Sequence, residues 1–159
     1  MTELKRILLV EDNPNDIELT LMALQEFHLA NEIIVVRDGN QALDYLYHRG
    51  AYKGNADGEP IMILLDLNLP GKDGREVLKT MKADVHLKNI PVVMLTSSRE
   101  EAERTDSHKL GVRDYLSKPI DFFQFAEVVG RLGASWAVVK RPSQKNQRVD
   151  SIFSSGKVL

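Results

Sequence analysis

Short apolar runs recur along the chain and alternate with segments of helical spacing. Each run has four or five residues, is nearly continuous and is rich in β-branched residues, which is typical of strands covered on both faces. We predict five such strands, at 6–10, 33–36, 61–65, 92–95 and 112–116. Between and after them, apolar residues recur at the spacing of one helix face. This spacing predicts helices at 14–27, 40–48, 75–83, 100–110 and 122–138.

The alternation of strand and helix indicates an α/β fold. A right-handed crossover through a helix is the usual way to join neighbouring parallel strands. We therefore predict a doubly wound, five-stranded parallel sheet with five helices on its two faces. Asn13 and Pro14 favour a helix start, because Asn caps helices and Pro suits the first turn. The stretch 50–60 exceeds the usual length of such a loop, so we expect an exposed excursion there.

Length and composition limit the classes of protein. The chain has 159 residues, of which 43% are hydrophobic and 28% charged, as is typical of one globular domain, and it has no cysteine. The lack of cysteine excludes disulfides and cysteine-based zinc sites, and it fits a reducing compartment. No apolar stretch approaches the roughly 18 residues of a membrane span, and no signal-peptide cleavage site follows the N-terminus. We therefore expect a cytoplasmic protein that does not associate with membranes.

Charge is distributed unevenly along the chain. Residues 1–139 carry 16 basic and 22 acidic side chains, whereas residues 140–159 carry five basic and one acidic. An acidic body argues against nucleic-acid binding. The basic tail is polar and lacks helical spacing, so we expect one domain at 1–139 and a flexible tail at 140–159. The alternative is that the tail is a docking peptide that uses Ile152 and Phe153.

Charged and hydroxyl residues follow four of the predicted strands. In a parallel sheet, the carboxyl ends of the strands lie along one edge, and ligands bind there. Taken singly, the acids and the threonine could be helix caps, and the lysine could be a solvated surface residue. Their convergence favours a site, because the opposite edge shows no comparable set. The side chains predicted at this edge are Glu11, Asp12, Asp66, Thr96, Ser97, Ser98, Ser117 and Lys118.

Metal-assisted phosphoryl transfer onto a carboxylate fits this set of residues. Three carboxylates in close proximity repel one another unless a cation joins them, and Mg²⁺ binds one or two carboxylates together with water and a phosphoryl oxygen. Asp66 could then act as the nucleophile, and we expect it to be exposed so that it can be reached. Lys118 would neutralise charge on the transferring oxygens, and Thr96 would donate a hydrogen bond to one of them.

Four segments carry a resemblance to a known family: LLVEDNP, ILLDLNLPGKDG, VVMLTSS and YLSKP. In this order they resemble the receiver domain of two-component response regulators, over residues of about 5 to 139. The stretch 50–60 and the segment DLNLPGKDGREVLKTMKAD are most similar to the single-domain regulators paired with cyanobacterial and bacterial phytochrome histidine kinases. The resemblance implies a flavodoxin-like sheet with strand order 2-1-3-4-5 and a receiver domain at 1–139.

The resemblance implies a phosphoacceptor and a metal site. Asp66 matches the residue that accepts a phosphoryl group from a phosphohistidine of a sensor kinase, here of phytochrome type. Asp12 matches the principal ligand of Mg²⁺, or of another divalent cation such as Mn²⁺. Glu11 is implied to assist through water, Asn68 to contribute its backbone carbonyl, and Asp66 to complete the metal site.

The resemblance also implies a switch. Thr96 and Lys118 match the switch hydroxyl and the phosphate-binding lysine. Tyr115 matches the aromatic residue that turns inward when Thr96 moves toward the phosphate. The bond between Lys118 and Pro119 is implied to be cis.

A changed protein-contact surface is the expected output. Phosphorylation adds about −1.5 to −2 charges, which Thr96 and Lys118 can bind only by approaching, and this closure biases a two-state equilibrium. No DNA-binding or enzymatic domain follows residue 139 in this sequence, so we expect signalling through an unknown downstream protein rather than an enzyme. Members of the family commonly form homodimers, and surplus aromatic residues favour a dimer face at Tyr115, Phe122 and Phe123.

Three other functions have to be weighed. A phosphatase with an aspartate nucleophile usually has a second acid two residues later, where this chain has Asn68. A flavodoxin-like cofactor binder needs a phosphate loop rich in Ser, Thr or Gly, but Glu11 and Asp12 would repel a phosphate there. A phosphate-independent interaction module stays open, because a complete site does not prove that a kinase uses it.

Overall fold

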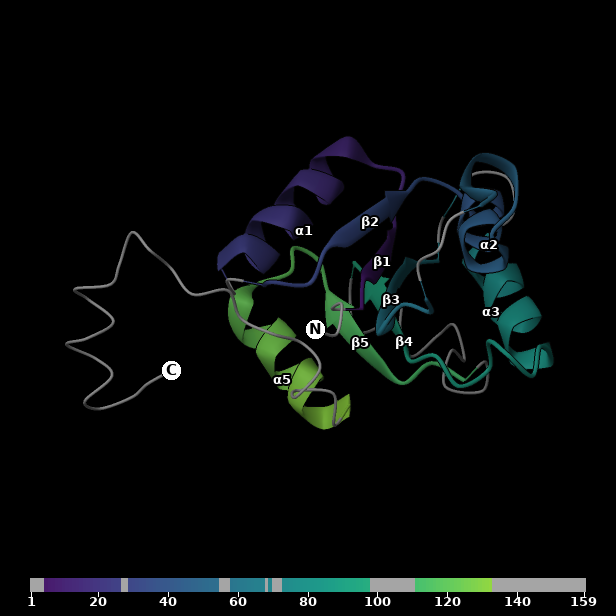
Figure 1. The fold of residues 1–159 in the computed structure, drawn as a ribbon. Coiled ribbons are helices and arrows are strands. Elements are labelled where there is room, and N and C mark those ends of the chain that lie inside the picture. The colour runs from purple at the N-terminus through teal and green to yellow at the C-terminus, as the bar shows by residue number, and fades with distance from the viewer. Residues whose placement is uncertain are drawn as a thin grey trace.

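The computed structural model describes residues 5–26, 29–54, 58–67, 69, 73–97 and 111–132. Figure 1 shows a twisted sheet between two layers of helices. The sheet has five parallel strands in the order β2-β1-β3-β4-β5, so the predicted doubly wound fold and its strand order are confirmed. All five strands lie within two residues of their predicted bounds. They are β1 (Ile7–Val10), β2 (Ile33–Val36), β3 (Met62–Asp66), β4 (Val92–Thr96) and β5 (Asp114–Ser117).

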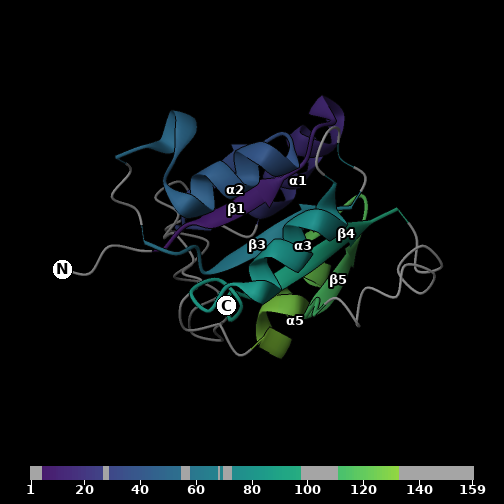
Figure 2. The same cartoon turned by 90° about the vertical axis from the view of Figure 1, so that its right-hand side faces the viewer.

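The helices cover both faces of the sheet. The views in Figures 1 and 2 agree that α1 and α5 lie on one face and that α2 and α3 lie on the other. The predicted helix at 100–110, the predicted end of the last helix beyond 132 and the tail at 140–159 lie outside the described residues. The described helices are α1 (Pro14–Glu26), α2 (Gly39–Tyr47), the 3₁₀ helix η1 (Gly50–Tyr52), α3 (Gly74–Ala83) and α5 (Phe122–Leu132).

Alternate side chains of each strand pack into two separate hydrophobic cores, one on each face of the sheet. In β1, Leu8 and Val10 pack in the layer of α2 and α3, whereas Ile7 and Leu9 pack in the layer of α1 and α5. Every residue of β1, β3 and β4 is buried, which explains why β1 is apolar throughout and why β3 and β4 are apolar up to their last residues. Each such side chain contributes about 1.5–3 kcal/mol on burial. The central strands are therefore held firmly, and the positions of their ends are fixed.

The register of the strands brings particular residues together at one edge. Val10 of β1 is paired with Leu65 of β3, so Glu11 and Asp66 follow at adjacent strand ends. On the other side of β3, Asp66 is paired with Leu95 of β4, which Thr96 follows. The backbone N–H of Lys118 donates to the carbonyl of Thr96 at 2.7 Å. Four strands thus deliver their terminal residues to a single edge.

The described helices that begin at this edge are capped by acidic or amide side chains, as α1 and α3 illustrate. The Asn13 side chain accepts a hydrogen bond from the backbone N–H of Asp16 at 3.0 Å, which confirms the predicted cap of α1. Asp73 caps α3 by accepting from the N–H groups of Arg75 and Glu76, at 2.8 and 3.1 Å. These caps fix where each helix starts relative to the strand ends.

The long connection after α2 is exposed over much of its described length, as expected. Gly50, Ala51 and Lys53 are exposed. Tyr52 is half-buried, and its ring meets that of Tyr45 edge to face, with centroids 5.2 Å apart. This contact attaches the 3₁₀ helix to α2. Among the described residues, no helix has both the length and the apolar character needed to cross a bilayer.

Position 74, where the end of β3 meets the start of α3, has no room for a side chain and therefore requires glycine. The N–H of Gly74 donates to the carbonyl of Leu67 at 3.1 Å, which draws the start of α3 against the end of β3. A Cβ atom on Gly74 would lie 2.9 Å from the carbonyl oxygen of Asp66 and 2.9 Å from the Cα of Leu67. Both are backbone atoms, so a larger residue has to move the end of the strand that carries Asp66.

Gly74→Ala is therefore expected to destabilise the fold by about 1–3 kcal/mol through overpacking. The matched control is Gly130→Ala in α5, where an added Cβ would meet no atom within 4 Å. There, alanine should stabilise the helix by about 0.5–1 kcal/mol, since it has less backbone entropy to lose. Urea unfolding followed by circular dichroism gives both values, and equal effects of the two variants would contradict the packing argument.

Candidate functional site

Asp66 ends the central strand of the sheet and is buried. Only 6% of its surface is exposed, so the expectation that it would be exposed was wrong. The reason is that β3 lies between β1 and β4 and that Lys118 Nζ contacts Asp66 Oδ2 at 2.9 Å. A buried carboxylate is tolerated when a cation pairs with it. The carboxylate is thus held in a fixed, largely desolvated position.

Lys118 is the centre of the charged cluster. Its ammonium nitrogen lies 2.8 Å from Glu11 Oε1, 2.9 Å from Asp66 Oδ2 and 3.0 Å from Asp16 Oδ2. Only 18% of its side chain is exposed, so it is not the solvated surface lysine of the simpler explanation. The bond from Lys118 to Pro119 is cis, as the resemblance implied.

Asp16 is a member of this cluster that the sequence analysis did not identify. It lies in the first turn of α1, where an acidic residue is ordinarily explained by the helix dipole. The signal that could have found it is its place three residues after the cap Asn13, close to the end of β1. Helical spacing alone does not say which side of α1 faces Lys118.

Burial and neighbouring charges shift the pKa values of Glu11 and Lys118. Burial raises the pKa of Glu11 to about 7; the Asp66 carboxylate adds to the rise, and Lys118 opposes it. Burial on its own would lower the pKa of Lys118, but its contacts with Glu11, Asp66 and Asp16 outweigh this effect and raise that pKa above its ordinary value. Lys118 therefore stays charged at neutral pH, whereas Glu11 is partly protonated.

Glu11, Asp12 and Asp66 can offer oxygen ligands to one metal ion. One carboxylate oxygen from each lies within 4.8 Å of the others. Glu11 Oε1 is buried and, despite its short distance to Lys118, makes no hydrogen bond of standard geometry among the described residues. An all-oxygen, acidic donor set suits a hard divalent cation such as Mg²⁺ or Mn²⁺. The residues therefore fit the predicted metal, and Asn68, the fourth predicted ligand, lies outside the described residues.

The predicted switch residues occupy the ends of β4 and β5. Thr96 is buried at the last position of β4, and its carbonyl receives the N–H of Lys118. Tyr115 of β5 is half-buried and packs against the core under α2 and α3. It is paired with Met94, two residues before Thr96, so both predicted switch residues belong to one face of the sheet.

The predicted dimer face is described only in part. Phe123 of α5 is 75% exposed, an unusual position for a large aromatic side chain. The side chain of Phe122 lies outside the described residues.

The predicted serines at the strand ends are described in part. Ser97 is exposed at the edge of the site, and Ser117 is half-buried. Ser98 lies outside the described residues.

A parallel 2-1-3-4-5 sheet with paired acids, a central aspartate and a lysine at its strand ends defines the class of receiver proteins. The model of the response regulator receiver domain matches residues 7–130 of this chain. The chain belongs to the response regulator receiver domain family.

Several relatives of this chain are response regulators, and some of them are described as phytochrome response regulators. It is 41% identical over 132 residues to the response regulator Rcp1 of Synechocystis sp., covering 83% of this chain and 88% of Rcp1. A structure of the bacteriophytochrome response regulator AtBRR has a TM-score of 0.82 and 53% identity, covering 88% of this chain and all of that one. The phosphorylated cyanobacterial phytochrome response regulator RcpA has a TM-score of 0.68 and 42% identity, covering 89% and 100% of the two chains. A crystal structure of Rcp1 is described as its Mn²⁺-bound form, with a TM-score of 0.66 and coverage of 87% and 99%.

Mg²⁺ binding is expected to release a proton near neutral pH. Glu11 has a pKa of about 7 without metal, and a bound cation favours the ionised carboxylate. The apparent Mg²⁺ affinity should therefore fall about tenfold between roughly pH 8 and pH 6. Isothermal titration calorimetry in two buffers of different ionisation enthalpy measures both the affinity and the protons released.

Glu11→Gln is the matched variant, because an amide of the same shape does not titrate. The pH dependence of Mg²⁺ affinity should be lost in it. The raised pKa of Glu11 also affects folding. Between pH 4.5 and about 7, the metal-free native state holds a proton on Glu11 and the unfolded chain does not. The contribution of Glu11 to folding stability therefore falls as the pH rises through that range. A wild-type affinity that is constant over the same pH range would contradict the assignment.

Proposed function

We propose that this protein accepts a phosphoryl group on Asp66 from a phosphohistidine of a sensor histidine kinase, with Mg²⁺ or Mn²⁺ at the adjoining acids, and signals through a changed protein-contact surface. The observation that carries the proposal is the contact of Lys118 Nζ with Asp66 Oδ2 at 2.9 Å, next to oxygens of Glu11 and Asp12. A nucleophilic carboxylate, a charged donor and a set of metal ligands are the parts that this transfer needs.

The residues can perform the transfer in one displacement. An oxygen of Asp66 attacks the phosphorus, the P–N bond of the phosphohistidine breaks, and its electron pair returns to the imidazole nitrogen. Lys118 stabilises negative charge on the phosphoryl oxygens, and the hydroxyl of Thr96 is available as a further donor. A divalent cation held by Glu11, Asp12 and Asp66 would supply additional charge stabilisation.

The relatives support both the chemistry and the partner. Rcp1 has been observed in a Mn²⁺-bound form, and RcpA in a phosphorylated form. RcpA and AtBRR are described as phytochrome response regulators, the latter of a bacteriophytochrome. We extend these properties to the present chain and propose that its kinase is of phytochrome type.

The proposed output is a change at the ends of β4 and β5. A phosphoryl group on Asp66 would draw Thr96 and Lys118 toward its oxygens, and Tyr115 would turn into the space behind Thr96. The exposed ring of Phe123, on the helix α5 that follows β5, offers a further apolar contact. We propose that this face supports a homodimer and binds a downstream protein, and that the protein acts in the cytoplasm.

Two other functions remain distinct from this proposal. Asn68 stands where an aspartate-nucleophile phosphatase would place its second acid, which disfavours enzymatic turnover of phosphate esters. An interaction module that needs no phosphate would not require Lys118 to neutralise buried carboxylates beside a set of metal ligands. We therefore propose that this protein acts as a phosphoacceptor rather than as an enzyme.

Acetyl phosphate with Mg²⁺ is expected to add one phosphoryl group to the wild-type protein, because Asp66 is an aligned nucleophile. Intact mass spectrometry measures the gain, and gel filtration of the same sample reports any dimer. Asp66→Asn should gain nothing. The matched control is Asp44→Asn, which alters an exposed pair with Arg49 and should be phosphorylated like the wild type. No gain in the wild type would favour the interaction module, and steady hydrolysis of phosphate esters would favour the phosphatase.

The kinase assignment is tested by transfer from purified, autophosphorylated histidine kinases. A phytochrome-type kinase should lose its phosphoryl group to this protein faster than a kinase with an unrelated sensor at the same concentration, since partners differ in the surface they recognise. Loss of label from each kinase over time gives the two rates. Equal rates, or a preference for the unrelated kinase, would count against phytochrome pairing without affecting the phosphoacceptor role.

A further inference from the structure

The ammonium group of Lys118 donates hydrogen bonds to two carboxylates, those of Asp16 and Asp66, and forms an ion pair with a third, that of Glu11. A lysine ammonium carries three donors. Three carboxylate oxygens lie within 3.0 Å of its nitrogen, from Glu11, Asp66 and Asp16. A phosphoryl group bound by Lys118 therefore competes with these carboxylates for the ammonium group.

The three carboxylates differ in how readily each can be given up. The side chain of Glu11 is fully buried and that of Asp66 is 9% exposed, and both belong to the group that fits a metal ion. The side chain of Asp16 is 33% exposed, and it does not belong to that group. A carboxylate that can be hydrated loses less when its ion pair breaks, so the contact with Asp16 costs least to break.

We infer that Asp16 is a positioning residue that holds Lys118 in the unphosphorylated protein and is displaced from it by the phosphoryl group. The inference rests on the proposed function. The backbone N–H of Asp16 is bonded to the side chain of Asn13 at 3.0 Å, so the residue is fixed in the first turn of α1 and only its side chain needs to move. Its carboxylate competes for Lys118 and repels the phosphoryl oxygens.

This competition sets how favourably Lys118 can turn to a phosphoryl group. Asp16 lies on α1 and Lys118 just after β5, so their contact joins two elements that are 102 residues apart in sequence. Asp66 is the proposed phosphoacceptor and also contacts Lys118. Among the residues of the predicted site whose contacts are described, Asp16 contacts Lys118 alone. Removal of its charge should therefore strengthen phosphoryl binding without removing a metal ligand.

Binding of fluoroberyllate, a stable analogue of the phosphoryl group, tests the inference. The full chain and its variant Asp16→Asn are titrated with fluoroberyllate at saturating Mg²⁺, and the bound anion is followed by fluorine NMR. We expect the variant to bind about threefold to tenfold more tightly, the range for loss of one opposing, partly exposed charge. Asp16→Ala should shift the affinity in the same direction, and Asp16→Glu, which retains the charge, should lie close to the wild type.

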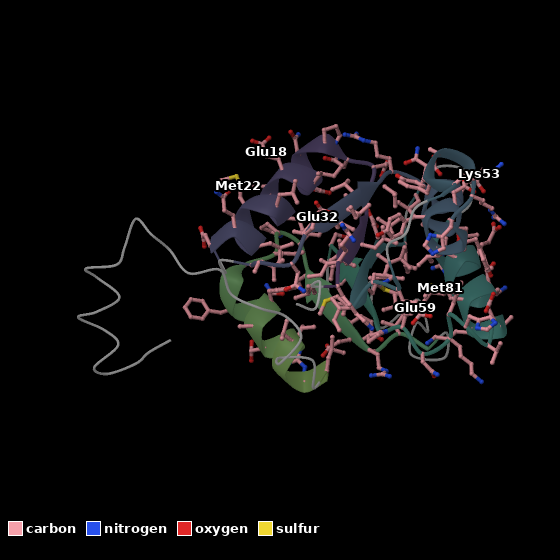
Figure 3. All side chains as sticks on the ribbon, in the orientation of Figure 1. Glu18, Met22, Glu32, Lys53, Glu59 and Met81 are labelled. Carbon is pink, nitrogen blue, oxygen red and sulfur yellow. The ribbon has the colours of Figure 1, made fainter. Side chains whose placement is uncertain are left out.

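Glu18→Gln is the matched control, because it removes the same charge from the same helix. Glu18 is exposed, and Figure 3 shows its side chain pointing outward from α1, away from the sheet. Its affinity for fluoroberyllate should equal that of the wild type. Mn²⁺ binding by each protein, measured from the electron paramagnetic resonance of the free ion, should not become tighter in Asp16→Asn.

Three results would overturn the inference. Unchanged or weaker fluoroberyllate binding by Asp16→Asn would show that Asp16 does not compete for Lys118. Equal tightening in Glu18→Gln would assign the effect to net charge, and tighter Mn²⁺ binding in Asp16→Asn would assign it to the metal. Failure of the proposed function looks different, because the wild type itself would then not bind fluoroberyllate and would gain no phosphoryl group on Asp66.

Discussion

The ion pairs of Lys118 are the interaction on which the site depends. They connect the end of β5 with the end of β3, 52 residues earlier, and with the start of α1, 102 residues earlier. Glu11 and Asp66 would be adjacent, buried and of like charge without this ammonium, and an unpaired buried charge is among the costliest features a fold can contain. Even with Lys118 present, burial raises the pKa of Glu11, and the neighbouring carboxylate of Asp66 adds to the rise.

The sheet supplies the rigid frame that makes this cluster useful. β3 lies at the centre of the sheet, with β1 and β4 as its neighbours, so residues from three adjacent strand ends surround Asp66. The buried strands beneath the site cannot shift without opening the core on both faces. The close approach of Gly74 to the carbonyl of Asp66 extends this frame to α3. A carboxylate held in this way meets its reaction partner without a search for the productive orientation.

The sequence predicted the elements well because strands buried on both faces have an unmistakable apolar pattern. The order of the strands did not follow from that pattern, since β1, β3 and β4 are equally buried, and it came from the family resemblance. The burial of Asp66 and the role of Asp16 depend on tertiary packing: on which strands flank β3 and on how α1 is rotated about its axis. The need for Gly74 likewise arises only from a neighbouring backbone.

The excess of negative charge has a functional consequence. Four carboxylates and one ammonium form this cluster, and both protonation of Glu11 and a bound cation would reduce its negative charge. A phosphoryl group on Asp66 would add further negative charge at the most enclosed point. Of the three carboxylates that contact Lys118, that of Asp16 is the most exposed, so its contact costs least to break. In the proposed function, metal binding, proton release and phosphoryl binding would all act on a single lysine, and displacement of the Asp16 carboxylate would break the ion pair between α1 and the residue that follows β5.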